Sequence, residues 1–136
     1  MADAPVVSNT TPIINLVGVG LLDVLAHIYG EVWIPEAVRA EYVVKATPTE
    51  PDLDALPWLV VHSVVPDQRV AGITRLGKGE IAAISLALAS NARAILLDDR
   101  LARKTATNLG LPVVGTVAVL VRAKTAGLIP ALALVR

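Results

Sequence analysis

Short, unbroken apolar runs alternate along this chain with segments whose apolar residues recur at helical spacing. Strands that face solvent on one side alternate apolar and polar residues, whereas strands buried on both sides are apolar throughout. The alternation therefore predicts an α/β fold in which helices cover both faces of a parallel sheet. The apolar runs expected to form strands are residues 4–8, 31–34, 58–65, 94–97 and 112–114.

The segments between these runs predict the helices and loops. Residues 80–91 are apolar almost without interruption, which indicates a helix buried nearly all round. Residues 46–57 are polar and rich in proline, so we expect a surface loop with about one helical turn there. Residues 67–79 predict an irregular connection, and a chain of 136 residues suits one domain over residues 1–136. Further helices are expected at residues 13–17, 21–28, 35–45, 101–109 and 116–126.

Two long uncharged stretches raise the question of a membrane span. Residues 4–22 and 105–121 lack charged side chains, but both contain several Asn, Pro and Gly residues. A spanning helix needs about 20 predominantly apolar residues, so each stretch is better interpreted as a buried strand, a turn and a buried helix. The N-terminus carries Asp3 and no basic residue, unlike a secretory signal. We therefore expect a soluble protein with no membrane partner.

The charged residues are unevenly distributed, although the net charge is zero. Residues 1–68 contain nine acidic and two basic side chains, whereas residues 69–136 contain three acidic and ten basic ones. One interpretation is that two solvated halves attract each other. The other is that a basic face for a polyanion lies beside an acidic pocket for a metal ion.

Polar residues follow the first and fourth predicted strands directly. Asn9, Thr10 and Thr11 follow the first strand, and Asp98 and Asp99 follow the fourth. Ligands of open parallel sheets bind beyond the carboxyl ends of the strands, so these five residues are candidate functional residues. Two adjacent carboxylates after an apolar strand are costly unless they are solvated or bind a cation. The alternative is that they cap the next helix.

Two glutamates complete the set of candidate acidic residues. Glu80 follows Gly77-Lys78-Gly79 and opens the most apolar predicted helix. An acidic residue there complements the helix dipole, and it also directs a carboxylate toward whatever lies above the helix N-terminus. Glu41 lies in the middle of another predicted helix and is uninformative alone. The Gly-x-Gly sequence indicates a phosphate loop only weakly, because the full dinucleotide and Walker patterns are absent.

Five segments, taken in their order and spacing, form a recognisable pattern. They are V-V-S-N-T-T-P-I-I-N-L (6–16), I-P-E-A-V-R-A-E (34–41), G-K-G-E-I-A-A-I-S-L-A (77–87), I-L-L-D-D-R-L-A-R (95–103) and G-L-P-V-V-G-T (110–116). Together they resemble the PIN-domain family of metal-dependent nucleases, most closely a prokaryotic branch of PIN-like nucleic-acid-binding proteins. The resemblance spans residues 6–129. It implies a three-layer α/β/α sandwich with a central parallel sheet of about five strands.

The resemblance also implies a site, because that family hydrolyses RNA with Mg²⁺ or Mn²⁺ held by three or four acidic residues. It places the metal ligands at Asn9, Glu41, Glu80 and at Asp98 or Asp99, the four carboxylates being the catalytic ones. Thr10 or Thr11 takes the family's hydroxyl position. Hard divalent cations prefer clustered oxygen ligands, and a metal-bound water becomes a usable hydroxide near neutral pH. The basic residues expected to contact phosphates are Lys78, Arg100, Arg103 and Lys104.

Asn9 departs from the family pattern, which usually has Asp at this position. An amide supplies one neutral oxygen, so this departure is expected to weaken metal binding. Three functions therefore stay open. The main hypothesis is a divalent-metal-dependent ribonuclease. The alternatives are a non-catalytic PIN-like module that binds nucleic acid or protein, and a nucleotide- or phosphate-binding α/β protein of another class.

The ribonuclease hypothesis carries expectations about partners and location. RNA is the expected substrate, Mg²⁺ or Mn²⁺ the cofactor, and the toxin half of a toxin–antitoxin pair the biological role. We accordingly expect a cognate antitoxin protein, a homodimer and a cytoplasmic location, with which the absence of cysteine agrees. The apolar segment 128–136 is expected either to be truncated or to bind a partner.

Overall fold

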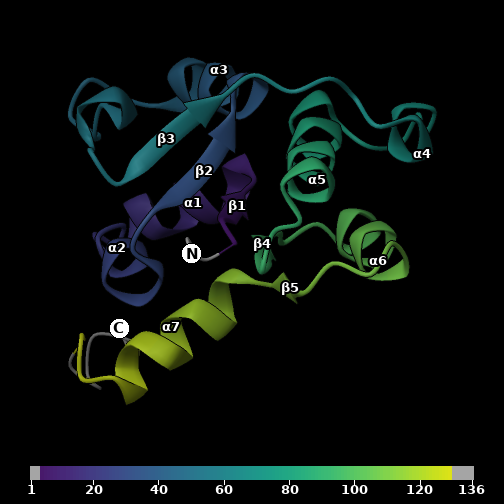
Figure 1. The fold of residues 1–136 in the computed structure, drawn as a ribbon. Coiled ribbons are helices and arrows are strands. Elements are labelled where there is room, and N and C mark those ends of the chain that lie inside the picture. Colours follow the sequence, from purple (N-terminus) through teal and green to yellow (C-terminus); the bar gives the residue numbers. More distant parts are fainter. Residues whose placement is uncertain (1–3, 130–136) are drawn as a thin grey trace.

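The central feature of the fold is a five-stranded, entirely parallel sheet. The computed structural model describes residues 4–129, and its strands are ordered β3-β2-β1-β4-β5 (Figure 1). The strand β1 lies at the centre, paired with β2 and β4, and all its residues are buried. The parallel sheet predicted from the apolar runs is therefore confirmed. Its strands are β1 (Val6–Ser8), β2 (Val32–Pro35), β3 (Leu59–His62), β4 (Ala94–Leu96) and β5 (Val113–Val114).

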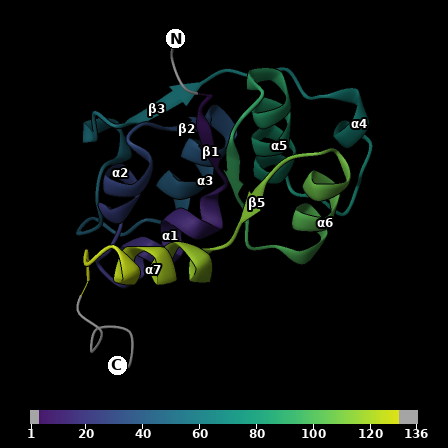
Figure 2. The same ribbon diagram turned by 60° about the horizontal axis from the view of Figure 1, so that its bottom comes forward.

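Helices cover the sheet and connect its strands. The helix α5 packs over β1, β2 and β4 and against α6, while α7 packs against α1 and α2 (Figure 2). These layers confirm the predicted three-layer α/β/α sandwich. The helices are α1 (Thr10–Gly18), α2 (Val24–Tyr29), α3 (Glu36–Lys45), α4 (Gln68–Ala71), α5 (Lys78–Ser90), α6 (Arg100–Asn108) and α7 (Thr116–Thr125).

The strand order places a topological switch point at the centre of the sheet. From β1 the chain continues outward to β2 and β3, and it then crosses back to add β4 and β5 on the other side. The reversal falls between β1 and β4, where the backbone N–H of Asn9 donates to Leu96 O at 3.0 Å. In open α/β sheets this switch point, at the carboxyl ends of the strands, is where ligands bind.

The helix α5 packs over the three strands nearest the switch point, β1, β2 and β4. Its residues from Ala82 to Ala87 are all buried, as the almost unbroken apolar sequence predicted. Three of its buried residues, Gly79, Ala82 and Ala83, carry at most a methyl group and so allow neighbouring elements to approach closely. The start of α5 thereby lies against the residues that follow β1 and against α3.

Two connections contain short helices, of which one was predicted and the other was not. The predicted turn in the polar loop is the 3₁₀ helix Leu53–Ala55. The connection 67–79, predicted to be irregular, contains the short helix α4, whose N-cap Asp67 accepts from Arg69 N. A tertiary contact fixes this segment, because Asp67 N donates to Ser85 Oγ on α5 at 2.8 Å.

No helix within residues 4–129 is both long enough and apolar enough to cross a bilayer. Residues 130–136, and with them most of the segment expected to bind a partner, lie outside the described residues.

Candidate functional site

Asn9 occupies the N-cap position of α1 but does not act as a capping side chain. An N-cap Asn normally accepts a hydrogen bond from the backbone N–H two or three residues later. The third residue here is Pro12, which has no N–H to donate. The Asn9 side chain is only 3% exposed, and its Oδ1 is buried without a hydrogen-bond partner. Within residues 4–129 the only other such side-chain atom is His62 Nε2.

The carboxylate of Glu41 lies beside this unpartnered oxygen. The buried Thr10 at the start of α1 donates its hydroxyl to Glu41 Oε1 at 3.3 Å. Both side chains also reach the backbone of Gly79 in the first turn of α5. A Cβ atom placed on Gly79 would overlap Glu41 Oε1 and would lie 3.4 Å from Asn9 Oδ1. The predicted metal ligands from β1 and α3 are thus brought together at α5.

Glu80 lies next to this pair, at the third position of α5. Its Oε1 accepts from Gly77 N at 2.8 Å, so it caps the helix N-terminus as its position suggested. Partial burial raises the pKa of Glu80, and the carboxylates of Asp99 and Glu41 raise it further. The hydrogen bond from Gly77 opposes this increase. Glu80 is therefore within electrostatic reach of two other candidate ligands.

The structure separates the roles of the two adjacent aspartates. Asp99 caps α6 by accepting from Ala102 N at 2.9 Å, and it is also the aspartate that acts on Glu80. Asp98 caps α7 instead, since its two carboxylate oxygens accept from the backbone and the hydroxyl of Thr116. Thus both aspartates cap helices, and Asp99 is the better placed for a shared site with Glu80.

Asn15, which the sequence did not single out, supports the position of Asp98. Its Nδ2 donates to Asp98 Oδ2 at 3.0 Å and is 3.5 Å from Thr116 Oγ1. This contact links α1 to the start of α7 across the switch point. The position of Asn15 in the sequence, within α1, gives no indication that its partner lies 83 residues later in the chain.

The predicted phosphate-binding residues fall into two groups. Lys78 at the start of α5 and Arg100 and Lys104 on α6 are exposed, as a contact with RNA requires. Arg103 is half-buried and donates through Nη1 to Leu97 O at 2.9 Å, so it also fixes α6 to the end of β4. Thr11 is exposed at the start of α1. Lys78 also lies at the rim of an apolar groove of about 460 Å³ between α3 and α5.

The donor set fits a hard divalent cation with few protein ligands. In the part of the chain that is described, none of the candidate carboxylates forms a salt bridge. Over the same residues, no group of three or more His, Cys, Asp or Glu side chains is close enough to hold a metal. Mg²⁺, however, is usually bound through one or two carboxylates and keeps several waters. The Asn9 amide oxygen and the Glu41 carboxylate, which both lie close to Gly79, are oxygen donors of the kind that such a cation uses.

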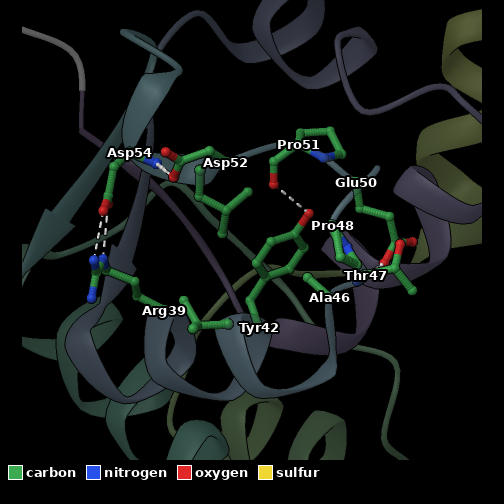
Figure 3. A pocket seen from close by; sticks show the side chains of 11 residues that line it. Arg39, Tyr42, Ala46, Thr47, Pro48, Glu50, Pro51, Asp52 and Asp54 are labelled. Atoms are coloured by element: carbon green, nitrogen blue, oxygen red, sulfur yellow. Dashed lines mark hydrogen bonds and ion pairs between the residues drawn. The ribbon is translucent and has the colours of Figure 1, made fainter.

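A second acidic region lies on the other face of α3. A cavity of about 310 Å³ lies between α3 and the loop that follows it, and its lining includes Glu50, Asp52 and Asp54 (Figure 3). Each of these carboxylates has a donor: Glu50 accepts from Thr47 N, Asp52 from Asp54 N, and Asp54 from Arg39. Because these polar groups already bond to one another, they are explained as contacts that hold the loop against α3.

Both the sequence and the fold are similar to those of known proteins. A family model described as a PIN domain matches residues 5–135. The structure is similar to a PilT N-terminus domain protein from the hyperthermophilic archaeon Sulfolobus solfataricus P2, with a TM-score of 0.65 and 18% sequence identity. That match covers 87% of this chain and 92% of the other, and at this identity it concerns the fold alone. No curated protein matches the sequence.

Proposed function

Because the chain belongs to the PIN-domain family, we propose that it is a divalent-metal-dependent ribonuclease with its site at the switch point between β1 and β4. The PIN fold supports a nuclease-type module. The observation that carries the proposal is the buried, unpartnered Oδ1 of Asn9 beside the Glu41 carboxylate. A buried acceptor without a donor is costly, and a cation would remove that cost.

Each residue of the site has a role that follows from its position. Asn9 and Glu41 would hold Mg²⁺ or Mn²⁺, and the Thr10 hydroxyl orients the Glu41 carboxylate. Glu80 at the start of α5 and Asp99 at the start of α6 would add negative charge around the ion and contact it directly or through water. When bound, the metal supplies an acidified water and neutralises charge that develops on the phosphate. Asp98 acts indirectly, by fixing α7 against α1.

The basic side chains at the starts of α5 and α6 explain how an RNA strand would be held. Lys78, Arg100 and Lys104 are exposed around the acidic rim and would pair with phosphates on either side of the scissile one. With four aromatic residues in the whole chain, base stacking contributes little. Binding is then carried mainly by backbone charge.

Cleavage of a labelled single-stranded RNA tests the proposal. The parent chain is expected to cleave it with Mn²⁺ or Mg²⁺ and to stop in chelator. Glu41→Gln should lose activity under the same conditions while keeping its circular-dichroism spectrum. Cleavage that continues in chelator, or that survives Glu41→Gln, would contradict a metal site built on Glu41.

A non-catalytic PIN-like module is the second candidate, and Asn9 is the observation that favours it. A neutral amide replaces the family's usual carboxylate, so the candidate metal site has one negative charge fewer. Under this alternative the chain binds single-stranded RNA equally well with and without metal and leaves it intact. A filter-binding experiment with and without chelator, run beside the cleavage assay, separates the two functions.

The finer biological assignments rest on the nuclease proposal. We propose that the protein acts in the cytoplasm as the toxin of a toxin–antitoxin pair, with an antitoxin protein and a second copy of the chain as partners. Growth arrest on expression in a bacterial host, relieved by Glu41→Gln, is the expected result. Normal growth with soluble, RNA-cleaving protein would contradict the toxin role while leaving the ribonuclease proposal in place.

A further inference from the structure

Gly79 stands where glycine has no conformational advantage. It is the second residue of α5, with helical backbone, and glycine is among the residues least favourable in a helix. The positive φ angles that favour glycine occur elsewhere among residues 4–129, at Gly20, Gly30, Gly110 and Gly127. The Gly-Lys-Gly sequence, which indicated a phosphate loop only weakly, therefore requires another explanation at its second glycine.

The space that Gly79 leaves is occupied by the site itself. A Cβ atom at this position would overlap Glu41 Oε1, approach Glu41 Cδ at 2.9 Å and lie 3.4 Å from Asn9 Oδ1. At Gly77, two residues earlier, the nearest atom to a Cβ would be Glu80 Oε1 at 3.5 Å, an ordinary contact. The two glycines of this short motif thus differ, and only Gly79 is crowded by candidate ligands.

We propose that Gly79 is a positioning residue of the metal site: its missing side chain leaves the space in which the Glu41 carboxylate and the Asn9 amide oxygen lie side by side. This inference rests on the proposed function. The inference adds one requirement to the acidic residues: the first turn of α5 must have no side chain at position 79, where it faces Glu41 of α3 and Asn9 after β1. A methyl group there would displace the carboxylate and leave the Asn9 oxygen without its neighbour.

The expected consequence separates folding from metal binding. The overlapping atom is the end of a flexible side chain, so Glu41 can rotate away from a methyl group at position 79. Gly79→Ala is therefore expected to keep a melting temperature in chelator close to that of the parent, because alanine also favours the helix. Its Mn²⁺ affinity should fall by tenfold or more, since the carboxylate has left the position beside Asn9.

The experiment measures melting temperature over a Mn²⁺ titration for the parent, Gly79→Ala and a control, Gly18→Ala. Gly18 is also helical, at the end of α1, and a Cβ there would meet no atom within 4 Å. We expect the parent and Gly18→Ala to be stabilised by Mn²⁺ alike, and Gly79→Ala to need at least tenfold more Mn²⁺ for the same shift. An equal response of Gly79→Ala and the parent would overturn the positioning role.

A comparison in chelator tests the crowding without any metal. In the parent, Gly79→Ala adds a methyl group that overlaps Glu41, whereas in a Glu41→Ala background that overlap is removed and only the ordinary contact with Asn9 Oδ1 remains. The substitution should consequently raise the melting temperature more in the Glu41→Ala background than in the parent, and Glu41→Ala should restore folding if Gly79→Ala alone does not fold. Equal shifts in the two backgrounds would show that position 79 does not contact Glu41.

The two measurements distinguish the inference from the proposed function. Coupling between positions 41 and 79 in chelator, together with no Mn²⁺ response of the parent, would refute the metal site and with it the positioning role. A Mn²⁺ response of the parent that Gly79→Ala leaves unchanged would keep the metal site and overturn only the inference. Coupling together with a selective loss of the Mn²⁺ response supports both.

Discussion

Carboxylates lie against two faces of α3, and the two groups differ in their partners. On one face, Asp54 is bound by Arg39, and this hydrogen bond holds the pKa of Asp54 below its ordinary value. On the other face, Glu41 adjoins Glu80, whose pKa burial and neighbouring carboxylates hold above its ordinary value. Glu41 has the Thr10 hydroxyl as a donor and no salt bridge within residues 4–129.

The contrast lies in one unpartnered acceptor rather than in the number of carboxylates. In the loop region every carboxylate has a nearby donor supplied by its own segment or by α3. At the switch point the four candidate carboxylates also have donors, but the buried Asn9 Oδ1 beside Glu41 has none. The number of carboxylates in each region is therefore less informative than the single unpartnered oxygen of Asn9. This buried acceptor is the feature on which the proposed cation site rests.

The largest expected effect comes from removing one negative charge on each face. Glu41→Gln should weaken Mn²⁺ binding by about 100-fold, because even residues that only support metal ligands change affinity by 10- to 100-fold. Asp54→Asn removes the same charge from the other face and should leave the Mn²⁺ affinity within about twofold, since Asp54 is exposed, is paired with Arg39, and salt screens exposed charges. Calorimetric titration of both variants checks this. Similar losses in the two would mean that overall charge, not the site, governs binding.

The next largest effect is a gain. Asn9→Asp is nearly isosteric and places a charged oxygen where the neutral one now lies, so it should tighten Mn²⁺ binding about tenfold, or 1.4 kcal/mol. In chelator the same variant should melt at a lower temperature, because another carboxylate then faces Glu41 and Glu80. Titration and melting curves with and without metal measure both effects. A variant that neither gains affinity nor loses stability in chelator would place residue 9 outside the site.

A smaller effect should follow from giving Asn9 an alternative partner. Pro12→Ala restores an N–H at the third position of α1, to which the Asn9 side chain can then bond as a normal cap. Such a cap contributes about 1 kcal/mol, so Mn²⁺ binding should weaken roughly fivefold. Pro57→Ala in the exposed loop is the matched control and should leave Mn²⁺ affinity unchanged. If Pro12→Ala binds Mn²⁺ as the parent does, the proline is not what keeps the amide oxygen free.

The smallest effect concerns pH in the absence of metal. The folded-state pKa of Glu80 lies above its ordinary value of 4.5, so ionised Glu80 costs stability at neutral pH, and that cost disappears as pH falls through the raised pKa. Glu80→Gln should therefore raise the melting temperature in chelator at pH 7 by about 1–3 °C and gain progressively less below the raised pKa. Asp54→Asn should do the reverse, since its lowered pKa contributes stability that acid removes. The same sign for both variants would refute the contrast.

The sequence predicted the sheet because burial on both faces leaves a direct trace in unbroken apolar runs. It also predicted that Asn9, Asp98 and Asp99 lie at the site's edge, since the ends of parallel strands meet there. It could not assign the two aspartates, because both follow β4 and only the position of α7 directs Asp98 to Thr116. The role of Gly79 was equally inaccessible, because it depends on the distance between α3 and α5.

Crystals grown with Mn²⁺ test the central claim most directly, because anomalous scattering locates the ion without reference to activity. The account predicts a peak beside the backbone of Gly79, at coordination distance, about 2 Å, from Asn9 Oδ1 and a Glu41 carboxylate oxygen. Glu80 and Asp99 should then face the ion directly or through water. Absence of a peak there at saturating Mn²⁺, or a peak in the loop cavity beside Asp52 and Asp54, would contradict the account.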